Sequence, residues 1–286
     1  KKILSLAFKI KKNQKKYSNI FANKSLGLLF EKESTRTRVS FNIGMKKLGG
    51  NVIELSKDQI GFGKRESISD ILQTLSQYID VLMIRNNSHD QLVEYASYNK
   101  ISIINGLSNY SHPCQILSDI FTITECLGNI ENKQITWLGD FNNVLVSLIQ
   151  AAEIFNFKLN ILIPKQIREK AKKEISNKKL VYSNFCKNFD LALKNSDCVM
   201  TDTWISMGEK NSTNKKQLLK KFQVNDTIMK KAKKQAIFMH CLPAHRNHEV
   251  TDSVIDSKQS LVWQQAKNRM YVQQSILYYL IKNDKK

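Results

Sequence analysis

The chain is poor in residues that break regular structure. Its 286 residues include only 3 Pro and 10 Gly, and 42% of them are hydrophobic. Disordered and collagen-like chains have the opposite composition, so both classes are excluded. At roughly 150 residues per domain, the length predicts about two domains.

Long apolar runs are also missing. The longest, around residues 144–155, contains Ser147, Gln150 and Glu153 and is much shorter than the ~20 residues of a membrane span. No acidic residue precedes Glu31, but the apolar part of this basic start, residues 3–8, is too short for the core of a targeting peptide. We therefore expect a basic amphipathic first helix.

The five cysteines show no Cys-x-x-Cys pair and no regular spacing. They lie at positions 114, 126, 186, 198 and 241. An odd number of scattered cysteines in a long chain is typical of a reducing compartment. We therefore expect a cytoplasmic protein.

Arginine is scarce although the chain is strongly basic. The formal charge is +20, from 45 Lys and Arg against 25 Asp and Glu, yet Arg occurs only at positions 36, 38, 65, 85, 168, 246 and 269. Nucleic-acid readers usually depend on the planar guanidinium, whereas this charge comes mostly from scattered lysines. The composition favours a solvated basic surface, and a nucleic-acid-binding protein remains the alternative.

Short apolar runs alternate with longer stretches of helical period, without repeats or low-complexity linkers. This alternation predicts an α/β fold of two doubly wound parallel-sheet domains with the active-site cleft between them. The expected strands are 26–30, 51–55, 81–84, 101–104, 135–138, 160–163, 198–201 and 237–239. We expect a first domain over 1–128, joined by a terminal helix within 265–286, and a second domain over 129–264.

Polar residues follow most of these runs, where parallel sheets bind their ligands. The segment 34–38, Ser-Thr-Arg-Thr-Arg, lies between a strand and a helix. Backbone N–H groups, hydroxyls and two guanidiniums can converge at such a helix start to hold a phosphate. An ordinary Ser cap followed by surface arginines is the simpler alternative.

A second segment, His112-Pro113-Cys114-Gln115, begins the next long helix. Proline is favoured at the first helical position, and His112 and Gln115 lie one turn apart. A histidine there can donate a hydrogen bond to a carbonyl oxygen that develops negative charge. A capping or buried structural histidine is the equally simple alternative.

The segment His240-Cys241-Leu242-Pro243-Ala244-His245, with His248 beyond it, contains four residues that can bind metals. Structural zinc sites usually have ligands in short paired spacings, so this pattern favours a shaped substrate loop instead. Residues 139–143 lack the G-x-G-x-x-G pattern and imply no dinucleotide site.

Together these segments resemble the aspartate/ornithine carbamoyltransferase family over nearly the whole chain. Residues 34–38 match its Ser-x-Arg-Thr-Arg signature, and residues 112–115 match its His-Pro-x-Gln. Residues 202–208, Asp-Thr-Trp-Ile-Ser-Met-Gly, and the His-Cys-Leu-Pro at 240–243 are similar to the ornithine-specific members.

The resemblance implies a role for particular residues. For carbamoyl phosphate they are Ser34, Thr35, Arg36, Thr37, Gln59, Arg85, His112 and Gln115, with Gln59 lent by a neighbouring subunit. For ornithine they are Asn143, Asp202, Ser206, Met207, Cys241 and Leu242. Arg36, Arg85, His112 and Cys241 are the expected catalytic residues, and Arg269 matches a late arginine of the family.

The implied activity is transfer of the carbamoyl group from carbamoyl phosphate to the δ-amine of L-ornithine, which gives L-citrulline and phosphate in arginine biosynthesis. The resemblance implies no cofactor, no metal and a homotrimer. We expect neither nucleic-acid nor membrane binding. A carbamoyltransferase acting on putrescine, N-acetylornithine or aspartate remains an alternative, as does a non-catalytic basic nucleic-acid-binding relative.

Overall fold

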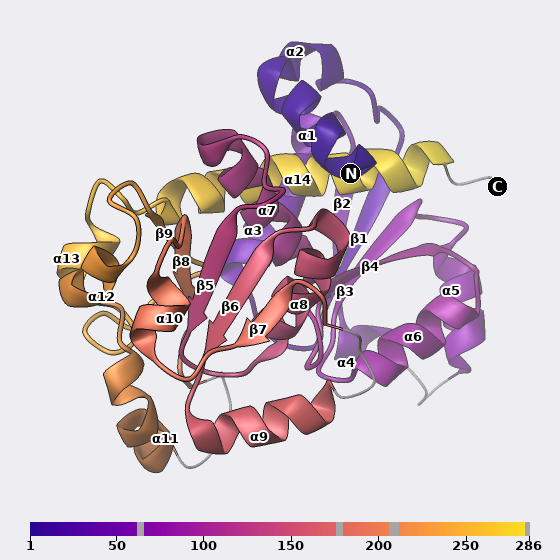
Figure 1. Ribbon diagram of the computed structural model, residues 1–286. Coiled ribbons are helices and arrows are strands. Elements are labelled where there is room, and N and C mark those ends of the chain that lie inside the picture. The colour runs from indigo at the N-terminus through magenta and orange to yellow at the C-terminus, as the bar shows by residue number, and fades with distance from the viewer. Residues whose placement is uncertain (62–65, 176–179, 206–211, 284–286) are drawn as a thin grey trace. The chain divides into compact units, whose positions relative to one another are not determined.

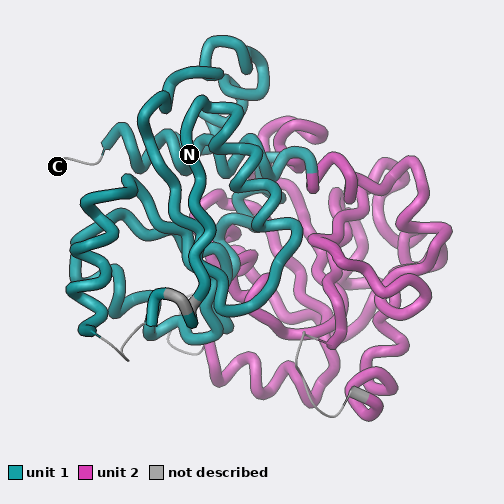
Figure 2. Tube along the Cα trace, turned by 180° about the vertical axis from the view of Figure 1, so that it is seen from behind, with its two compact units in different colours: residues 1–121, 267–286 teal, residues 122–266 magenta. Residues whose placement is uncertain are grey.

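The structure is a computed structural model that describes residues 1–61, 66–175, 180–205 and 212–283. The chain forms two compact units (Figure 2). Unit 1 contains residues 1–121 and 267–286, and unit 2 contains residues 122–266. The chain therefore leaves unit 1 once and returns to it at the C-terminus.

Unit 1 is built on a parallel sheet with the strand order β2-β1-β3-β4. The strands are β1 (Ser25–Phe30), β2 (Asn51–Ser56), β3 (Val81–Arg85) and β4 (Ser102–Leu107). The helices are α1 (Lys2–Lys12), α2 (Gln14–Tyr17), α3 (Thr35–Lys47), α4 (Lys57–Ile60), α5 (Ile68–Leu75), α6 (His89–Ser97) and α7 (Pro113–Leu127), which runs on into unit 2.

The C-terminal helix α14 (Val262–Asn283) completes unit 1 by packing beside the first helices (Figure 1). Lys11 Nζ donates to Asn268 Oδ1 at 2.8 Å, and Gln14 Nε2 donates to the Tyr271 hydroxyl at 3.2 Å. These contacts join segments 257 residues apart in the sequence. The terminal helix predicted within 265–286 is confirmed, and it begins three residues earlier, at Val262.

Unit 2 contains a second parallel sheet, with the order β7-β6-β5-β8-β9. Its strands are β5 (Gln134–Leu138), β6 (Lys158–Leu162), β7 (Ser183–Phe185), β8 (Cys198–Thr201) and β9 (Ile237–His240). Its helical segments are α8 (Asn143–Phe155), α9 (Lys165–Glu174), α10 (Phe189–Leu193), α11 (Ser212–Leu219), η1 (Lys220–Phe222), α12 (Asp226–Lys231) and α13 (Asp252–Ile255).

The predicted fold class of two doubly wound parallel sheets is confirmed, and each of the eight predicted strands is present. Strand β7 was not predicted. Its three residues, Ser-Asn-Phe, form an exposed edge strand in which no side chain is fully buried. Such a segment has neither the apolar run nor the alternation that identifies a strand in a sequence.

In both sheets the first strand of the unit lies in the middle, and the chain moves outward on both sides of it. The strand order reverses between β1 and β3 in unit 1 and between β5 and β8 in unit 2. Open α/β sheets bind ligands at the carboxyl ends of the strands at such a reversal. The topology therefore points to one candidate site in each unit.

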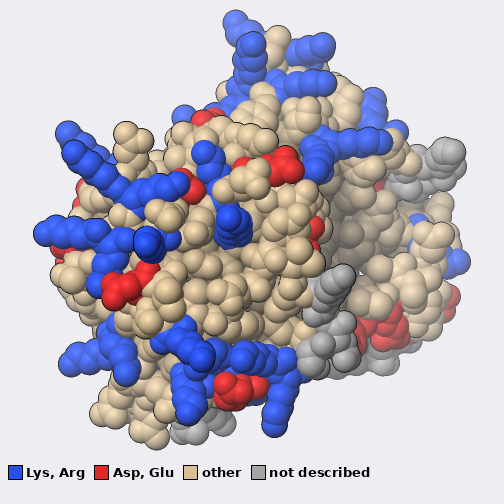
Figure 3. Space-filling model, in the orientation of Figure 1, with Lys and Arg blue, Asp and Glu red and all other residues tan. Residues whose placement is uncertain are grey.

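The basic surplus lies on the surface as separate groups of side chains. On the face drawn in Figure 3, lysines and arginines alternate with acidic and uncharged residues. Among the described helices, none has both the length and the apolar character of a membrane span.

Candidate active site

The candidate phosphate segment lies at the start of α3, a few residues beyond the end of β1. Ser34 caps the helix: its Oγ accepts the Thr37 N–H at 3.4 Å, and its hydroxyl donates to Thr37 Oγ1 at 3.0 Å. Thr35 and Arg36 occupy the first turn, where backbone N–H groups have no acceptor within the helix. The helix dipole adds positive potential there, so this segment has the local geometry for holding an anion.

Arg38 does not join this anion site, although the sequence placed it there with Arg36. Its guanidinium lies 5.3 Å from the centre of the Phe30 ring and 3.4 Å from the Glu54 carboxylate on β2. An α-helix turns about 100° per residue, so positions 36 and 38 point to nearly opposite sides. The expectation that both guanidiniums converge is therefore wrong.

Arg269 reaches the same helix start from α14. Its Nη2 donates to Thr37 Oγ1 at 2.7 Å, and its Nη1 donates to Gln115 Oε1 at 3.0 Å. Gln115 Nε2 in turn donates to Asp119 Oδ1 at 2.8 Å. All four side chains are buried. A buried guanidinium with two fixed acceptors joins the two segments that the sequence singled out, 34–38 and 112–115.

His112 lies immediately before α7 and is only 5% exposed. Burial, and then the positive charges of Arg269, Arg85 and Arg36, lower the pKa of His112 well below its usual range. The imidazole is therefore neutral at pH 7 and can donate one hydrogen bond from its protonated nitrogen. A neutral donor surrounded by cations suits a polarised carbonyl next to a phosphate.

Arg85 is the last residue of β3 and lies at the same edge of the sheet. In the register of β1 and β3 it is opposite Phe30, and its carbonyl accepts the Glu31 N–H at 3.0 Å. The ends of β1 and β3 therefore bring Arg85 beside the loop that leads to Ser34. Unit 1 thus assembles every residue predicted there for carbamoyl phosphate except Gln59, whose backbone lies in α4 and whose side chain is outside the described residues.

The central group in unit 2 is the buried carboxylate of Asp202, directly after β8. Asn142 Nδ2 donates to its Oδ2 at 2.7 Å, and Cys241 Sγ donates to its Oδ1 at 2.9 Å. Both partners are neutral amide or thiol groups. The nearby Asp140 carboxylate, by contrast, is paired with Lys215 Nζ at 2.6 Å.

Asn142 is a functional residue that sequence reasoning missed. Its Oδ1 caps α8 by accepting the N–H groups of Val144 and Leu145, both at 3.1 Å, while its Nδ2 fixes Asp202. An Asn directly before an apolar helix is a recognised cap signal that the sequence carried. Asn143, the residue predicted to bind ornithine, is the first residue of that helix.

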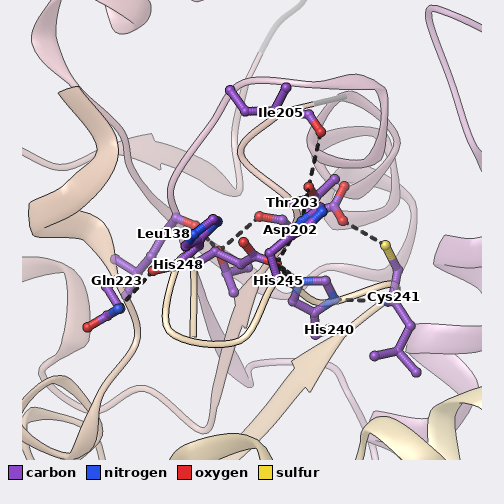
Figure 4. A network of polar contacts seen from close by, with 12 residues as sticks. Leu138, Asp202, Thr203, Ile205, Gln223, His240, Cys241, His245 and His248 are labelled. Atoms are coloured by element: carbon purple, nitrogen blue, oxygen red, sulfur yellow. Dashed lines mark hydrogen bonds and ion pairs between the residues drawn. The ribbon is translucent and has the colours of Figure 1, made fainter. Parts of the chain in front are cut away.

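Cys241 and Leu242 directly follow β9, and Leu242 has a positive φ of 58°. Figure 4 shows the Cys241 sulfur directed toward Asp202. His240 Nδ1 accepts the Leu242 N–H at 2.9 Å, which assigns the proton to Nε2, 3.2 Å from Glu249 Oε1. The same oxygen of Glu249 accepts the His245 N–H at 2.6 Å. The fully buried His240 and Glu249 thus hold both ends of the loop, and Glu249 is a second residue that the sequence interpretation missed.

The four possible metal ligands of this loop do not come together among the described residues. Asp202, His240 and Cys241 have ligand atoms within 4.8 Å of one another, but each is hydrogen bonded to a protein group. The rings of His245 and His248 instead stack on each other with centroids 6.0 Å apart, and His245 Nδ1 lies 3.0 Å from Thr203 Oγ1.

Two predicted ornithine residues, Ser206 and Met207, lie outside the described residues. The remaining four, Asn143, Asp202, Cys241 and Leu242, follow strands β5, β8 and β9 of the same sheet. Strands β5 and β8 flank the reversal of strand order, so the candidate site of unit 2 occupies the position that the topology predicts.

The fold and the two candidate sites define a two-unit α/β protein. One unit has a positively charged site suited to an anion, and the other has a site centred on a buried carboxylate. Residues 1–125 match the model for the carbamoyl-phosphate-binding domain of aspartate/ornithine carbamoyltransferase. Residues 131–280 match the model for the aspartate/ornithine-binding domain. The chain therefore belongs to the aspartate/ornithine carbamoyltransferase family.

Individual relatives agree with this assignment. The chain is 44% identical to an ornithine carbamoyltransferase of Nitrobacter winogradskyi over 91% of its own length and 85% of the relative. It is also 44% identical to that of Ruthia magnifica, over 98% and 94%. Among solved structures, ornithine carbamoyltransferase from Pyrococcus furiosus superposes with a TM-score of 0.88 at 36% identity, covering 99% of this chain and 93% of that one.

Proposed function

We propose that this protein transfers the carbamoyl group of carbamoyl phosphate to the δ-amine of L-ornithine, releasing L-citrulline and phosphate. The observation that carries the proposal is the buried Arg269, which joins Thr37 to Gln115 beside the neutral His112. It is supported by the resemblance of both units to domains of ornithine carbamoyltransferases. Residues 1–128 with 265–286 would form the carbamoyl-phosphate domain, and residues 129–264 the ornithine domain.

Unit 1 supplies the groups for carbamoyl phosphate. Ser34, Thr35, Arg36 and Thr37 bind the phosphate through hydroxyl, guanidinium and backbone donors. Arg85, His112 and Gln115 bind the carbamoyl end, while Arg269 keeps Thr37 and Gln115 in place. A phosphate with nearly two negative charges is stabilised by such a cationic setting, and its stabilisation grows as the bridging oxygen leaves.

Unit 2 supplies the groups for ornithine. Asn143 binds the α-carboxylate, Asp202 and Ser206 bind the α-ammonium, and Met207 contributes its backbone. Cys241 and Leu242 line the path of the δ-amine. The neutral partners of Asp202 leave its negative charge for a cationic ligand, whereas Lys215 already compensates Asp140. This difference supports Asp202 as the group that recognises the ammonium.

The chemical step follows from these positions. The δ-ammonium has a pKa of about 10 in water and must lose a proton before it can attack. The nitrogen lone pair then forms a bond to the carbamoyl carbon, and the bond from that carbon to the phosphate oxygen breaks with its electron pair leaving on phosphate. The attached nitrogen loses its second proton to the departing phosphate, which gives neutral citrulline nitrogen and hydrogen phosphate. Arg36, Arg85 and His112 stabilise the charge that develops on the carbonyl oxygen and the leaving group, and no cofactor or metal takes part.

We further propose a homotrimer in which Gln59 completes the carbamoyl-phosphate site of a neighbouring subunit. Exposed apolar residues support an interface on the same part of unit 1. Val39 and Ile43 on α3 are 52% and 41% exposed, and Ile53 on the edge strand β2 is 48% exposed. The Gln59-bearing α4 follows β2 directly. The cytoplasm and arginine biosynthesis are the proposed location and pathway.

The proposed activity is tested by a citrulline assay with carbamoyl phosphate and competing acceptors. We expect ornithine to be carbamoylated in preference to putrescine, N-acetylornithine and aspartate. Preference for one of the other acceptors would assign a different carbamoyltransferase. Salt-dependent binding of DNA or RNA without carbamoylation of any acceptor would instead support the nucleic-acid alternative.

Subunit complementation tests the trimer proposal. Arg36→Ala and Gln59→Ala variants, each nearly inactive alone, are dissociated, mixed and reassembled. If Gln59 serves a neighbouring site, some interfaces in the hybrids contain both native residues and part of the activity returns. Each variant reassembled with itself is the control. Hybrids that form but stay as inactive as the parents would place Gln59 in its own subunit's site or outside catalysis.

A further inference from the structure

Arg85 and His112 stand on two segments that extend beyond the regular ladder of β3 and β4. The ladder shifts between Ile84, opposite Asn105, and Arg85, opposite Leu107, so Gly106 is an extra residue. A side chain at Gly106 would place its Cβ 2.2 Å from Met83 Sδ. Past this bulge one backbone hydrogen bond still joins the two segments, from the Asn86 N–H to the Leu107 carbonyl at 3.1 Å. Beyond Leu107, side-chain contacts connect them.

His89, the first residue of α6, connects these segments. Its N–H donates to Asn109 Oδ1 at 3.0 Å, and its Nδ1 lies 3.0 Å from Ser108 Oγ. Its ring packs against Tyr110 with centroids 5.1 Å apart. His89 follows Arg85, the end of β3, by only four residues. Its three contacts therefore connect the segment after β3 with the loop after β4.

The loop that His89 holds leads directly to His112. Ser108 is fully buried; its N–H donates to the Ser111 carbonyl at 2.9 Å, and its Oγ accepts the Ser111 N–H at 3.1 Å. Asn105 Nδ2 donates to Ser111 Oγ at 3.0 Å. The position of Ser111, the residue before His112, thus depends on Ser108, and Ser108 contacts His89.

We infer that His89 is a positioning residue, which fixes His112 relative to Arg85 through Ser108 and the 108–111 loop. The inference rests on the proposed function, because it assigns His112 and Arg85 to the carbamoyl end of the substrate. His89 itself contacts no substrate in this scheme. It sets the distance between two groups that must act on one carbonyl oxygen.

Small displacements of such groups have large effects on rate. A donor that is misplaced by about 1 Å can lower the rate up to 100-fold. The loss of one of several ties displaces the loop only partly, so we expect a reduction in kcat of about tenfold. Because the phosphate contacts at α3 are unchanged, KM for carbamoyl phosphate changes much less.

The test compares variants that separate the ring from its hydrogen bond. His89→Phe keeps a ring against Tyr110 but removes the contact to Ser108, and His89→Asn keeps a polar group near Ser108. We expect His89→Phe to lower kcat about tenfold and His89→Asn to stay within threefold of the wild type. Asp90→Asn, at the next and exposed position of α6, is the matched control and retains full activity.

A double variant tests whether His89 acts through Ser108. If it does, His89→Phe adds little to the loss caused by Ser108→Ala, so the two losses are not additive. Additive losses, or a His89→Phe variant with wild-type kcat, would overturn the inference.

Histidine-selective NMR gives a readout that does not depend on activity, because the chain has only five histidines. The His112 ring signals of the substrate-free protein should shift or broaden in His89→Phe and Ser108→Ala but not in Asp90→Asn. Unchanged His112 signals in both of the first two variants would contradict the inference. If the wild type formed no citrulline, the proposed function would fail while this measurement would still decide the role of His89.

Discussion

The candidate sites of the two units have opposite charge. In unit 1, Arg36, Arg85 and Arg269 surround a neutral His112, and the buried Arg269 is held by two side-chain acceptors. In unit 2, one buried carboxylate, Asp202, is held by neutral donors. Under the proposed function, the first arrangement concentrates positive charge for a strongly anionic substrate, and the second keeps one negative charge for a cationic group of the other substrate.

This comparison also explains why each unit needs a buried anchor. Like charges brought together repel, and a buried carboxylate is costly unless it is hydrogen bonded. Arg269 is anchored on Thr37 and Gln115, whereas Asp202 is anchored on Asn142 and Cys241. Variants that remove a charge but keep its anchor test the comparison most directly.

The largest effect is expected for Arg36→Ala in unit 1. If Arg36 stabilises the leaving phosphate as proposed, its removal should lower kcat/KM at least 100-fold, about 3 kcal/mol of transition-state stabilisation, with the fold retained. Arg38→Ala is the matched control, since Arg38 lies over Phe30 and near Glu54. Steady-state kinetics at low carbamoyl phosphate measure both. Equal losses in the two variants would show that the effect is general surface charge and not the anion site.

The second effect concerns Asp202→Asn in unit 2. A hydrogen bond to a charged group contributes about 1.5–3 kcal/mol, so kcat/KM for ornithine should fall about 10- to 100-fold. Putrescine, which lacks the α-carboxylate and the α-ammonium, should lose much less, so the preference for ornithine shrinks. Asp190→Asn, on an exposed carboxylate paired with Lys231, is the control. An unchanged preference would mean that Asp202 does not recognise the α-ammonium.

The candidate sites of the two units were predictable from the sequence to different degrees. The signature segments 34–38 and 112–115 identified most of unit 1's site because each lies at a strand-to-helix junction. The bond from Arg269 to Thr37 was not predictable, because it depends on the return of α14 across 232 residues. Arg38 was misassigned because Arg36 and Arg38 were expected to face the same site. In the helix, side chains two residues apart point to nearly opposite sides.

In unit 2 the sequence indicated the loop at 240–245 but not what shapes it. In the sequence, Glu249 is one acidic residue in a polar stretch. Only the fold shows that it is fully buried and contacts His240. The strands themselves were predictable because a parallel sheet buried on both faces leaves continuous apolar runs. Side-chain anchors of this kind leave no such pattern.

The third effect is on stability. It tests whether His112, unlike a histidine at an exposed position, makes the free energy of unfolding depend on pH. The pKa of His112 is lowered in the folded protein, so below pH 6.5 the unfolded chain binds a proton that the folded chain does not. The free energy of unfolding should therefore decrease as the pH falls below 6.5, by about 1.4 kcal/mol per pH unit from this group. Urea unfolding at pH 7.5 and 5.5 should show a smaller decrease for His112→Gln than for the wild type.

His248→Gln, at an exposed position, is the control for that measurement and should follow the wild type. If His112→Gln and the wild type lost the same stability between the two pH values, His112 would not be buried in its neutral form. The electrostatic description of unit 1 would then need a protonated imidazole.

The smallest effect, about 1 kcal/mol, is expected for one of two glutamines of α14 that lie in different units. Gln273 is fully buried in unit 1, and neither end of its amide has a hydrogen-bond partner among the described residues. Gln265 is buried in unit 2, where its Oε1 accepts the His240 N–H at 3.1 Å. A buried amide without hydrogen-bond partners lowers the stability of the folded protein by about 1–3 kcal/mol. Removing the acceptor of a buried N–H lowers it by a similar amount.

The same substitution should therefore have opposite signs at the two positions. Gln273→Leu should raise the free energy of unfolding by about 1 kcal/mol, and Gln265→Leu should lower it by about 1–3 kcal/mol because the His240 N–H loses its acceptor. Thermal unfolding compares the stability of each variant with that of the wild type. The midpoint temperature Tm shifts by about 2–4 °C per kcal/mol in chains of about 150–250 residues. Gln273→Leu should leave kcat unchanged, while Gln265→Leu should also impair the loop that carries Cys241. If both variants were destabilised alike, Gln273 would have a polar partner in solution, and the buried surroundings of Arg269 would be more polar than the contacts described above.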